Sequence, residues 1–355
     1  MKERTKCRLC GCSVELAFML KPTPIANSFP DKPDSNAERY ALDLMQCVGC
    51  GHIQQRLVGE GLYEDYRYRT PAAVKEHLAP VARKIATENP GGRVLEIGSN
   101  NGMFLECLMA EGLDVLGVDP ASTHYMGIKD YFGERVAATL GEFDVIVANN
   151  VFAHIDDLDD VFRGISKCLS PSGQLIFEVQ YLIDMLETGA FDMIYHEHMD
   201  YHHVSPLKPF LRKHGLVMVD CERIKTHGGS IRVTAQKVGV ECDSWPERID
   251  WAEFSRKLSI AREHANSLGK VQAFGATAKA TTLISQLGLE DKIEFVVDNT
   301  PEKQGRYIPG TDIPIYPVEK LHDGPVLMTA WNYEKEIRAQ IDNELIHPFK
   351  PKGAA

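Results

Sequence analysis

Arg93-Val-Leu-Glu-Ile-Gly-Ser-Asn-Asn-Gly102 is the stretch of this chain that decides its fold. Its first residues form a short apolar run typical of a buried strand, and Gly98 and Gly102 punctuate the turn that follows. Residues 103–111 then carry the apolar spacing of an amphipathic helix. A strand that runs through a glycine turn into a helix begins a β/α unit, so the stretch predicts an α/β fold.

Further strands and helices alternate on the C-terminal side of this stretch. A pair of late strands ends the series, which therefore predicts a doubly wound sheet closed by a hairpin-like pair. A charged helix at 250–266 then leads into a second, smaller Rossmann-like unit that ends near 326–331. The strands expected for the large sheet are 93–98, 114–118, 143–148, 175–179, 217–222 and 231–235, and those of the small unit begin at 271–274 and 293–297.

Four of the nine cysteines form two knuckles, Cys7-x2-Cys10-Gly11 and Cys47-x2-Cys50-Gly51. Thiolates are the soft ligands that zinc prefers, and four of them complete a tetrahedral site. A redox CxxC is the alternative, but two matching knuckles favour metal. Because all four positions would be filled by Cys7, Cys10, Cys47 and Cys50, we expect a structural zinc in an N-terminal module.

Charge and composition limit the classes of partner. The net charge of −11 argues against a phosphate-backbone partner, because nucleic-acid binders gather Lys and Arg into patches. The chain has no run of 18 uncharged apolar residues, and its first residues lack the apolar region of a secretory signal. We therefore expect a cytoplasmic protein with neither a nucleic acid nor a membrane as partner.

The glycine turn differs from the G-x-G-x-x-G loop of dinucleotide folds. Glu96, at the end of the strand and two residues before Gly98, gives the pattern E-x-G-x-x-x-G, which resembles that of class I S-adenosylmethionine (SAM) methyltransferases. Asp119 lies 21 residues past Gly98, where a carboxylate can accept both ribose hydroxyls. The resulting candidate cofactor residues are Glu96, Gly98, Asn100, Asn101, Gly102, Asp119, Pro120, Asn149 and Asn150.

Tyr195-His196-Glu197-His198 begins a segment with four histidines between positions 196 and 203. Imidazole titrates nearest neutrality, and a carboxylate beside it can fix its tautomer, so the segment favours acid/base chemistry. A metal site and a hydrogen-bonded structural cluster are the alternatives. Ligands of an α/β sheet bind outside the carboxyl ends of the strands. His154 and Gln180 follow two of these strands, and the histidine segment leaves from the same edge.

Many separated motifs in one order resemble a family of zinc-containing sugar C-methyltransferases that act on nucleotide-linked 4-keto-deoxyhexoses. The resemblance covers nearly the whole chain. It implies a zinc-binding domain at 1–68, a SAM-binding domain at 69–245 and a nucleotide-sugar-binding domain at 246–355. Besides the knuckles and the glycine loop, the motifs are Pro24-Ile-Ala-Asn-Ser-Phe29, Asn150-Val-Phe-Ala-His154, Tyr195-His-Glu-His198, His227-Gly-Gly-Ser230, and Asp298 through Gln304-Gly-Arg-Tyr307 to Ile313-Pro-Ile315.

The resemblance also implies roles for individual residues. A ketone at C4 acidifies the C3 proton; His198 would remove it, Tyr195 and Glu197 would position the substrate or tune the base, and His154 would donate to the enolate oxygen. A core imidazole is the alternative for His154. One tyrosine near the sugar is implied, either Tyr66 or Tyr68. The full substrate-binding set is Tyr66, Tyr68, Gln180, His196, His227, Gly228, Lys279, Asn299, Arg306 and Asn332.

The last domain would hold the nucleotide diphosphate through the Gly275-x3-Lys279 turn. Family members commonly read Lys-Gly-Asn-Thr where this chain has Lys279-Ala-Thr-Thr282. The leading hypothesis is a monomeric SAM-dependent C-methyltransferase that methylates C3 of a dTDP- or GDP-linked 4-keto sugar. An O- or N-methyltransferase on a similar sugar is the alternative within the same class. A nucleotide-sugar epimerase or oxidoreductase is a different class, which the absence of G-x-G-x-x-G at Gly275 disfavours.

Overall fold

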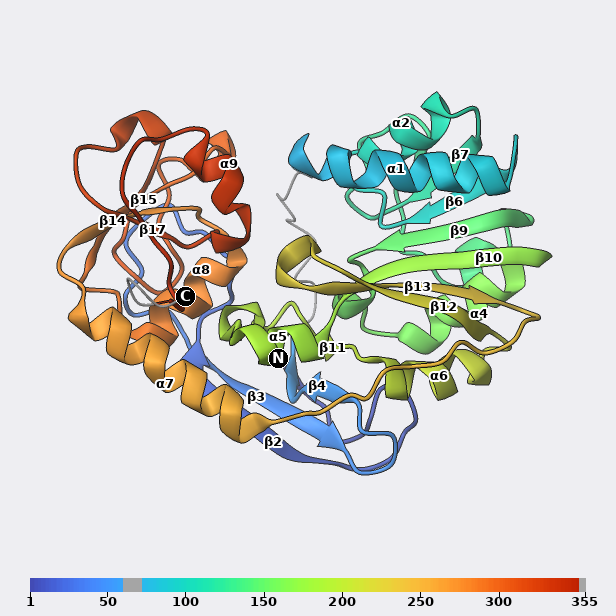
Figure 1. Cartoon of the computed structure of the whole chain (residues 1–355), viewed down its shortest axis with the longest axis horizontal. Coiled ribbons are helices and arrows are strands. Elements are labelled where there is room, and N and C mark those ends of the chain that lie inside the picture. Colours follow the sequence, from blue (N-terminus) through green and yellow to red (C-terminus); the bar gives the residue numbers. More distant parts are fainter. Residues whose placement is uncertain (60–71, 351–355) are drawn as a thin grey trace.

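The computed structural model describes residues 1–59 and 72–350. Figure 1 shows two lobes, one built on the long central sheet and one formed by the C-terminal unit. Strands β2, β3 and β4 of the N-terminal part run beneath both lobes, and α5 (Leu182–Thr188) lies between the lobes. None of the helices in the described ranges is long and apolar enough to cross a membrane.

The N-terminal sheet is antiparallel and has the strand order β11-β4-β3-β2. Its edge strand β11 comes from far along the chain, with Asp200 opposite Gln54 and Tyr201 opposite Ile53. The residues that directly follow His198 therefore belong to the sheet of the zinc module. The strands are β2 (Val14–Thr23), β3 (Tyr40–Cys47), β4 (Ile53–Gln55) and β11 (Asp200–Tyr201), beside a small pair of β1 (Lys2–Glu3) and β5 (Leu57–Val58).

The central sheet has seven strands in the order β12-β13-β10-β9-β6-β7-β8. Strands β10, β9, β6, β7 and β8 are parallel, whereas β13 and β12 are antiparallel to their neighbours. This matches the doubly wound sheet with a late strand pair that the sequence predicts. The strands are β6 (Arg93–Ile97), β7 (Asp114–Val118), β8 (Gly127–Ile128), β9 (Phe143–Asn149), β10 (Leu169–Gln180), β12 (Val217–Ile224) and β13 (Ser230–Gln236).

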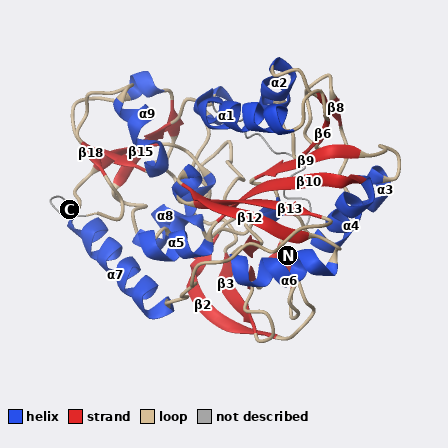
Figure 2. Ribbon diagram, turned by 45° about the vertical axis from the view of Figure 1, so that its right-hand side comes forward, coloured by secondary structure: helices blue, strands red, loops and turns tan. Residues whose placement is uncertain are grey.

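Helices cover both faces of the central sheet, because alternate residues of each strand point to opposite faces. Val145 and Val147 pack with α1 (Ala72–Glu88) and α2 (Met103–Ala110), whereas Ile146 and Ala148 pack with the helices of the other face. Figure 2 shows α1 and α2 above the strands and α6 below them. The helices of the second face are α3 (Glu134–Ala137), α4 (Leu158–Cys168) and α6 (Val204–Lys213).

The C-terminal unit is a five-stranded parallel sheet in the order β16-β15-β14-β17-β18. Consecutive strands run outward from β14 on one side and then from β17 on the other, the order of a Rossmann-like unit. The strands are β14 (Val271–Phe274), β15 (Ile293–Val297), β16 (Ile315–Tyr316), β17 (Val326–Met328) and β18 (Leu345–Ile346), and the helices are α7 (Trp251–Ser267), α8 (Ala278–Leu287) and α9 (Glu334–Arg338).

One hydrophobic core joins the three parts of the chain. It combines side chains of the N-terminal sheet, such as Leu42 and Ile53, with Phe191 and Ile194 of the segment before the histidines and with helices α7 and α8. Burial of this apolar area stabilises the arrangement of the parts, since each of them contributes to the same core. The histidine segment is therefore held from both the N-terminal sheet and the C-terminal unit.

Candidate active site

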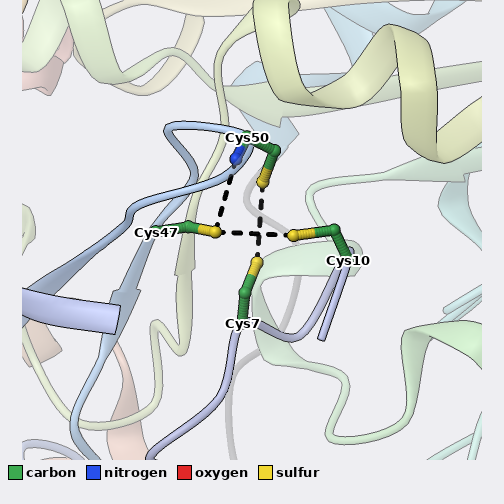
Figure 3. A group of neighbouring side chains, drawn as sticks. All are labelled: Cys7, Cys10, Cys47 and Cys50. Atoms are coloured by element: carbon green, nitrogen blue, oxygen red, sulfur yellow. Dashed lines mark hydrogen bonds between the residues drawn. The ribbon is translucent and has the colours of Figure 1, made fainter. Parts of the chain in front are cut away.

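The four knuckle cysteines converge on one point (Figure 3). Cys7 Sγ lies 3.6 Å from Cys50 Sγ, Cys10 Sγ lies 3.4 Å from Cys47 Sγ, and all four sulfurs lie within 4.8 Å of one another. Zn–S bonds of about 2.3 Å in a tetrahedron separate the sulfurs by about 3.8 Å, so the cage fits zinc. The N–H groups of Gly49 and Cys50 donate to Cys47 Sγ, as expected of a metal knuckle.

Within residues 1–59 and 72–350, no second group of histidine, cysteine and carboxylate side chains has the spacing of a metal cage. The metal interpretation of the histidine segment thus finds no support in the described part of the chain. The zinc site has no open position for a substrate, because all four ligands come from the protein. Its role is structural.

The glycine turn after β6 has the backbone conformation of a cofactor loop. Gly98 and Gly102 have φ values of 76° and 80°, and a Cβ at Gly98 would lie 2.2 Å from a methyl group of Val151. Only glycine fits this approach without strain. Asp119, directly after β7, accepts the N–H of Asn100 at 2.9 Å and that of Ala121 at 2.6 Å. The turn and the carboxylate thus form one unit at the carboxyl edge of the sheet.

Glu96 is 5% exposed at the end of β6. Burial, together with the nearby Asp119 carboxylate, raises the pKa of Glu96 to about 8. Its Oε2 atom is buried and has no hydrogen-bond partner among the described residues, and the same holds for Oδ1 of Asn101 and Nδ2 of Asn149. Such groups are costly unless a ligand or water satisfies them. Together they fit the polar amino-acid and ribose groups of SAM.

The remaining two candidate cofactor residues lie in the same region. Pro120 is partly buried in the turn after Asp119. Asn150 has a φ of 56° and donates its N–H to the Glu178 carbonyl at 2.8 Å. A non-glycine residue rarely adopts this left-handed conformation, and such residues cluster at functional sites. The turn after β9 is thus fixed beside the glycine loop.

His198 and Tyr195 form a buried pair. His198 Nδ1 lies 2.9 Å from the Met193 carbonyl, and His198 Nε2 lies 2.6 Å from the Tyr195 hydroxyl. Because a carbonyl only accepts hydrogen bonds, Nδ1 carries the proton and Nε2 presents a lone pair, to which Tyr195 donates. Burial, with a further contribution from His154, holds the pKa of His198 well below its usual range. The His198 ring is therefore uncharged near neutral pH, with its lone pair on Nε2.

His154 belongs to the short helix η1 (Phe152–His154) after β9, and its ring centroid lies 4.8 Å from that of His198. Its Nδ1 lies 2.8 Å from the Glu197 carbonyl, so Nδ1 again carries the proton. Burial lowers the pKa of His154 to about 4. The neutral ring has its lone pair on Nε2, and the predicted donor role toward an enolate requires a second proton on His154.

Glu197 and His196, the two residues before His198, bond to the N-terminal part of the chain. Glu197 accepts the N–H of Asn27 at 2.9 Å, within the Pro24–Phe29 motif, and burial raises the pKa of this carboxyl. His196 Nε2 lies 3.2 Å from the Ala41 carbonyl, and burial lowers the pKa of His196 to about 4. His198 thus bonds to the Tyr195 hydroxyl, whereas Glu197 and His196 bond to backbone groups of the N-terminal part.

The C-terminal unit brings a cation to this region. Lys279, in the first turn of α8, is 8% exposed, bonds to the side chain of Asn332 and lies with Nζ 4.9 Å from the Trp331 ring centroid. Burial lowers the pKa of Lys279 to about 8. Its charge contributes to the lowered pKa values of His198 and His227, which places all three groups in one electrostatic environment.

His227 and Gly228 contact the C-terminal unit from the turn before β13. His227 has a φ of 54°, and burial, with a contribution from Lys279, lowers its pKa to about 4, although part of the residue reaches solvent. A Cβ at Gly228 would lie 2.6 Å from the Trp331 ring, so glycine permits this contact. Gln180 lies opposite Ser230 at the end of β10, beside the same turn.

Four further residues were predicted to bind the substrate, and two of them are outside the residues that the structure describes. Asn299 is exposed and donates to Gln340, and Arg306 donates to the Phe29 carbonyl and pairs with Asp31. Within the described part of the chain, neither residue forms a hydrogen bond or ion pair with a histidine, and their substrate-binding role stays a prediction. Tyr66 and Tyr68 lie outside the described residues, so their assignment stays a prediction.

The sequence interpretation missed Asp192 and Glu178. Asp192 is fully buried, accepts the Trp331 indole N–H at 2.6 Å, and has a pKa raised to about 6 by burial. Burial alone would raise the pKa of Glu178, but hydrogen bonds from His77 and Arg232 outweigh it and lower the value. Each is a lone carboxylate in an apolar run, which is the signal that was available in the sequence.

A doubly wound sheet with a buried carboxylate in its first strand, Glu96, and a further carboxylate directly after its second, Asp119, is consistent with the SAM-dependent methyltransferase class. Three family models match consecutive parts of the chain: "Putative zinc binding domain" (residues 7–60), "Methyltransferase domain" (residues 63–220) and "C-methyltransferase C-terminal domain" (residues 245–346). C-methyltransferase NovU of Streptomyces niveus is 32% identical over 389 residues, covering 96% of this chain and 92% of NovU. The chain belongs to this C-methyltransferase family.

Two further similarities cover only part of the chain. A ubiquinone biosynthesis O-methyltransferase of Burkholderia pseudomallei (strain 1710b) is 24% identical over 168 residues, covering 39% of this chain and 70% of that protein. The PH0226 protein of Pyrococcus horikoshii OT3 is 18% identical, with a TM-score of 0.39, over 50% of this chain and 99% of that one. The match to NovU extends over all three family models, and the protein is a SAM-dependent C-methyltransferase with a structural zinc.

Proposed function

We propose that this enzyme methylates C3 of a nucleotide-linked 4-keto-deoxyhexose and gives a branched-chain sugar. The observation that carries the proposal is the pair of neutral imidazoles, His154 and His198, with ring centroids 4.8 Å apart and both Nδ1 protons held by carbonyls. A C-methyltransferase has to generate a carbanion, and a carbon beside a ketone is acidic enough for a side-chain base.

His198 is the proposed base. Its Nε2 lone pair accepts the C3 proton, either through the Tyr195 hydroxyl that now donates to it or after that hydroxyl has turned to the substrate. SAM, when bound, supplies the electrophilic methyl that the enolate carbon attacks. His154, after it has taken up a proton from solvent on Nε2, donates to the enolate oxygen and so stabilises the charge that develops there.

A bound diphosphate would offset part of the effect that lowers the pKa of His198. Burial is the main cause of the low pKa values of His198 and His227, and the Lys279 charge adds to it. An anionic diphosphate beside the Lys279 ammonium would offset this positive charge, and the pKa values of both histidines would rise. The Lys279 site, with Asn332 bonded to it, thus supports a dTDP- or GDP-linked substrate, and binding of the correct substrate activates the base.

The test is to incubate the purified protein with SAM and a panel of dTDP- and GDP-linked 4-keto-deoxy sugars, and to analyse the products by mass spectrometry and NMR. We expect a gain of one methyl group on C3 for at least one sugar, and exchange of the C3 proton with solvent deuterium. A methyl group on oxygen or nitrogen would instead identify an O- or N-methyltransferase. SAM binding with no methyl gain on any keto sugar contradicts the proposal.

A further inference from the structure

Arg8, between the zinc ligands Cys7 and Cys10, reaches from the first knuckle into the interior of the protein. Its Nη1 atom lies 2.7 Å from Asp200 Oδ2, and the two side chains are 2% and 0% exposed. A buried ion pair is costly to form and costly to break, since removal of one partner leaves a buried charge. Asp200 comes two residues after His198, so the pair joins the knuckle to the histidine segment.

The same guanidinium holds the other side of the site. Its Nη2 atom donates to the carbonyl groups of Ile155 and Asp156, at 2.8 Å for Asp156. These are the two residues that directly follow His154. One side chain therefore contacts the backbone next to His154 and the carboxylate two residues after His198. The planar guanidinium of arginine can make these contacts at once, whereas the single ammonium of lysine cannot.

The second knuckle holds the same carboxylate. His52, which directly follows Gly51, lies with Nε2 2.8 Å from Asp200 Oδ1, and both side chains are fully buried. Asp200 is thus fixed by Arg8 from the first knuckle and by His52 from the second. A zinc ion that joins the two knuckles also fixes the positions of these two side chains relative to each other.

Backbone hydrogen bonds complete the connection between Asp200 and the histidines. The Met199 N–H donates to the Ala153 carbonyl at 2.7 Å, and the Gln55 N–H donates to the Met199 carbonyl at 3.0 Å. The residue after His198 is therefore bonded to the residue before His154. A shift of Asp200 or of Ile155 changes the separation of the two rings.

We propose that Arg8 is a positioning residue, which transmits the geometry of the zinc knuckles to His154 and His198. The inference rests on the proposed function for the roles of the two histidines, but the positioning itself has a readout that needs no substrate. The Nδ1 protons of His154 and His198 are bonded to carbonyls in a buried site, so they should exchange slowly with water and be visible by 15N-edited NMR.

The experiment compares the full-length, zinc-loaded protein with Arg8→Lys and with the matched control Arg56→Lys. Arg56 pairs with Asp43 and Glu3 in the same N-terminal part and does not contact Asp200. Lysine at position 8 keeps the charge beside Asp200, but its single ammonium cannot also hold both carbonyls. The two Nδ1 signals are assigned from the His154→Gln and His198→Gln variants.

In Arg8→Lys we expect a full zinc content, an unchanged SAM affinity, and Nδ1 exchange at His154 that is about 10-fold faster or more. With an accepted keto-sugar substrate, we expect kcat to fall about 10- to 100-fold with little change in KM, because misplacement by about 1 Å costs on the order of 100-fold. Arg56→Lys should match the wild type. Wild-type Nδ1 shifts and exchange in Arg8→Lys overturn the proposal, as does a loss of SAM affinity equal to the loss of kcat.

The two proposals fail in different ways. If no keto sugar is methylated by the wild-type protein, the proposed function is wrong, and the NMR comparison still decides whether Arg8 positions the histidines. If methylation is found and Arg8→Lys retains both the wild-type kcat and the wild-type Nδ1 exchange, Arg8 has no positioning role.

Discussion

The glycine loop and the histidine site lie at the same edge of the central sheet, but their titratable groups differ: the loop region has acidic groups and the histidine site has uncharged imidazoles. The loop carries two carboxylates, of which Asp119 accepts two backbone N–H groups and Glu96 is buried with a pKa raised to about 8. The histidine site holds uncharged imidazoles, whose protons are fixed by carbonyl groups. The first region has buried acidic and amide groups that fit a polar ligand, and the second is the region in which we propose proton transfer.

The two regions also differ in how they are assembled. Glu96, the glycine turn and Asp119 come from one β/α/β stretch of the chain, so the loop keeps its form locally. The segments that carry His154 and His198 depend on contacts with the knuckles, the N-terminal sheet and the short helix η2 (Phe191–Met193). The contrast teaches that ligand binding and proton transfer should respond separately to mutation.

The largest expected difference between an effect on catalysis and an effect on SAM binding is in His198→Gln. Loss of the base should lower both methylation and C3 deuterium exchange about 1,000-fold, because a general base contributes roughly 100- to 10,000-fold. The dissociation constant for SAM, measured by calorimetry, should stay within about 2-fold of the wild-type value. His322→Gln, at an exposed histidine of the C-terminal unit, is the control. Deuterium exchange at the normal rate in His198→Gln would remove His198 from the role of base.

The converse change is Asp119→Asn in the cofactor loop. Hydrogen bonds to a charged group contribute roughly 1.5–3 kcal/mol, so SAM affinity should fall about 10- to 100-fold. The Nδ1 signals of His154 and His198 should stay as in the wild type. Asp114→Asn, at the exposed start of the same strand β7, is the matched control. An equal loss of affinity in both variants would show that the position of the Asp119 carboxylate has no special role.

A third expected effect, on folding and not on catalysis, is the pH dependence of stability, tested with Glu96→Gln. The pKa of Glu96, about 8 in the folded protein, lies above the value of about 4.3 for an unfolded glutamate. The folded state therefore keeps a proton that the unfolded state loses, and this contribution to stability is full below about pH 4.3 and is lost as the pH rises to 8.

Urea unfolding of the SAM-free protein at several pH values measures this effect. Relative to Glu96→Gln, the free energy of unfolding of the wild type should fall by at most about 1.4 kcal/mol per pH unit between pH 5 and 8. Glu106→Gln, at an exposed glutamate of α2, should follow the wild type. Parallel curves for the wild type and Glu96→Gln would contradict the raised pKa.

The sequence predicted those parts of the molecule whose conformation is determined by residues close together in the chain. The knuckle spacing and the glycine loop each define a turn by a few neighbouring residues, and both have the expected geometry. The division of roles among His196, Glu197 and His198 was left open, because these residues lie in an irregular segment. Their directions are set by Ala41, Asn27 and Met193, two of which are distant in the sequence.

Two other features depended on pairing that no local pattern shows. Strand β11 has only two residues, too few for a period of alternation, and its partner β4 lies about 145 positions earlier in the chain. The Asp192–Trp331 hydrogen bond likewise joins residues of two different units. Tyr66 or Tyr68 as a neighbour of the sugar stays a prediction.

The pairing of β11 with β4 has a consequence for recombination among relatives of this enzyme. An exchange of the first 58 residues between two members would give each chain an edge strand that had evolved beside a different sheet. The block that can be inherited as a unit is therefore discontinuous: it comprises the N-terminal module and the short segment around Asp200–Tyr201. Crossovers that keep these two stretches from one parent should yield active chimeras more often than crossovers placed at the boundaries of the contiguous domains.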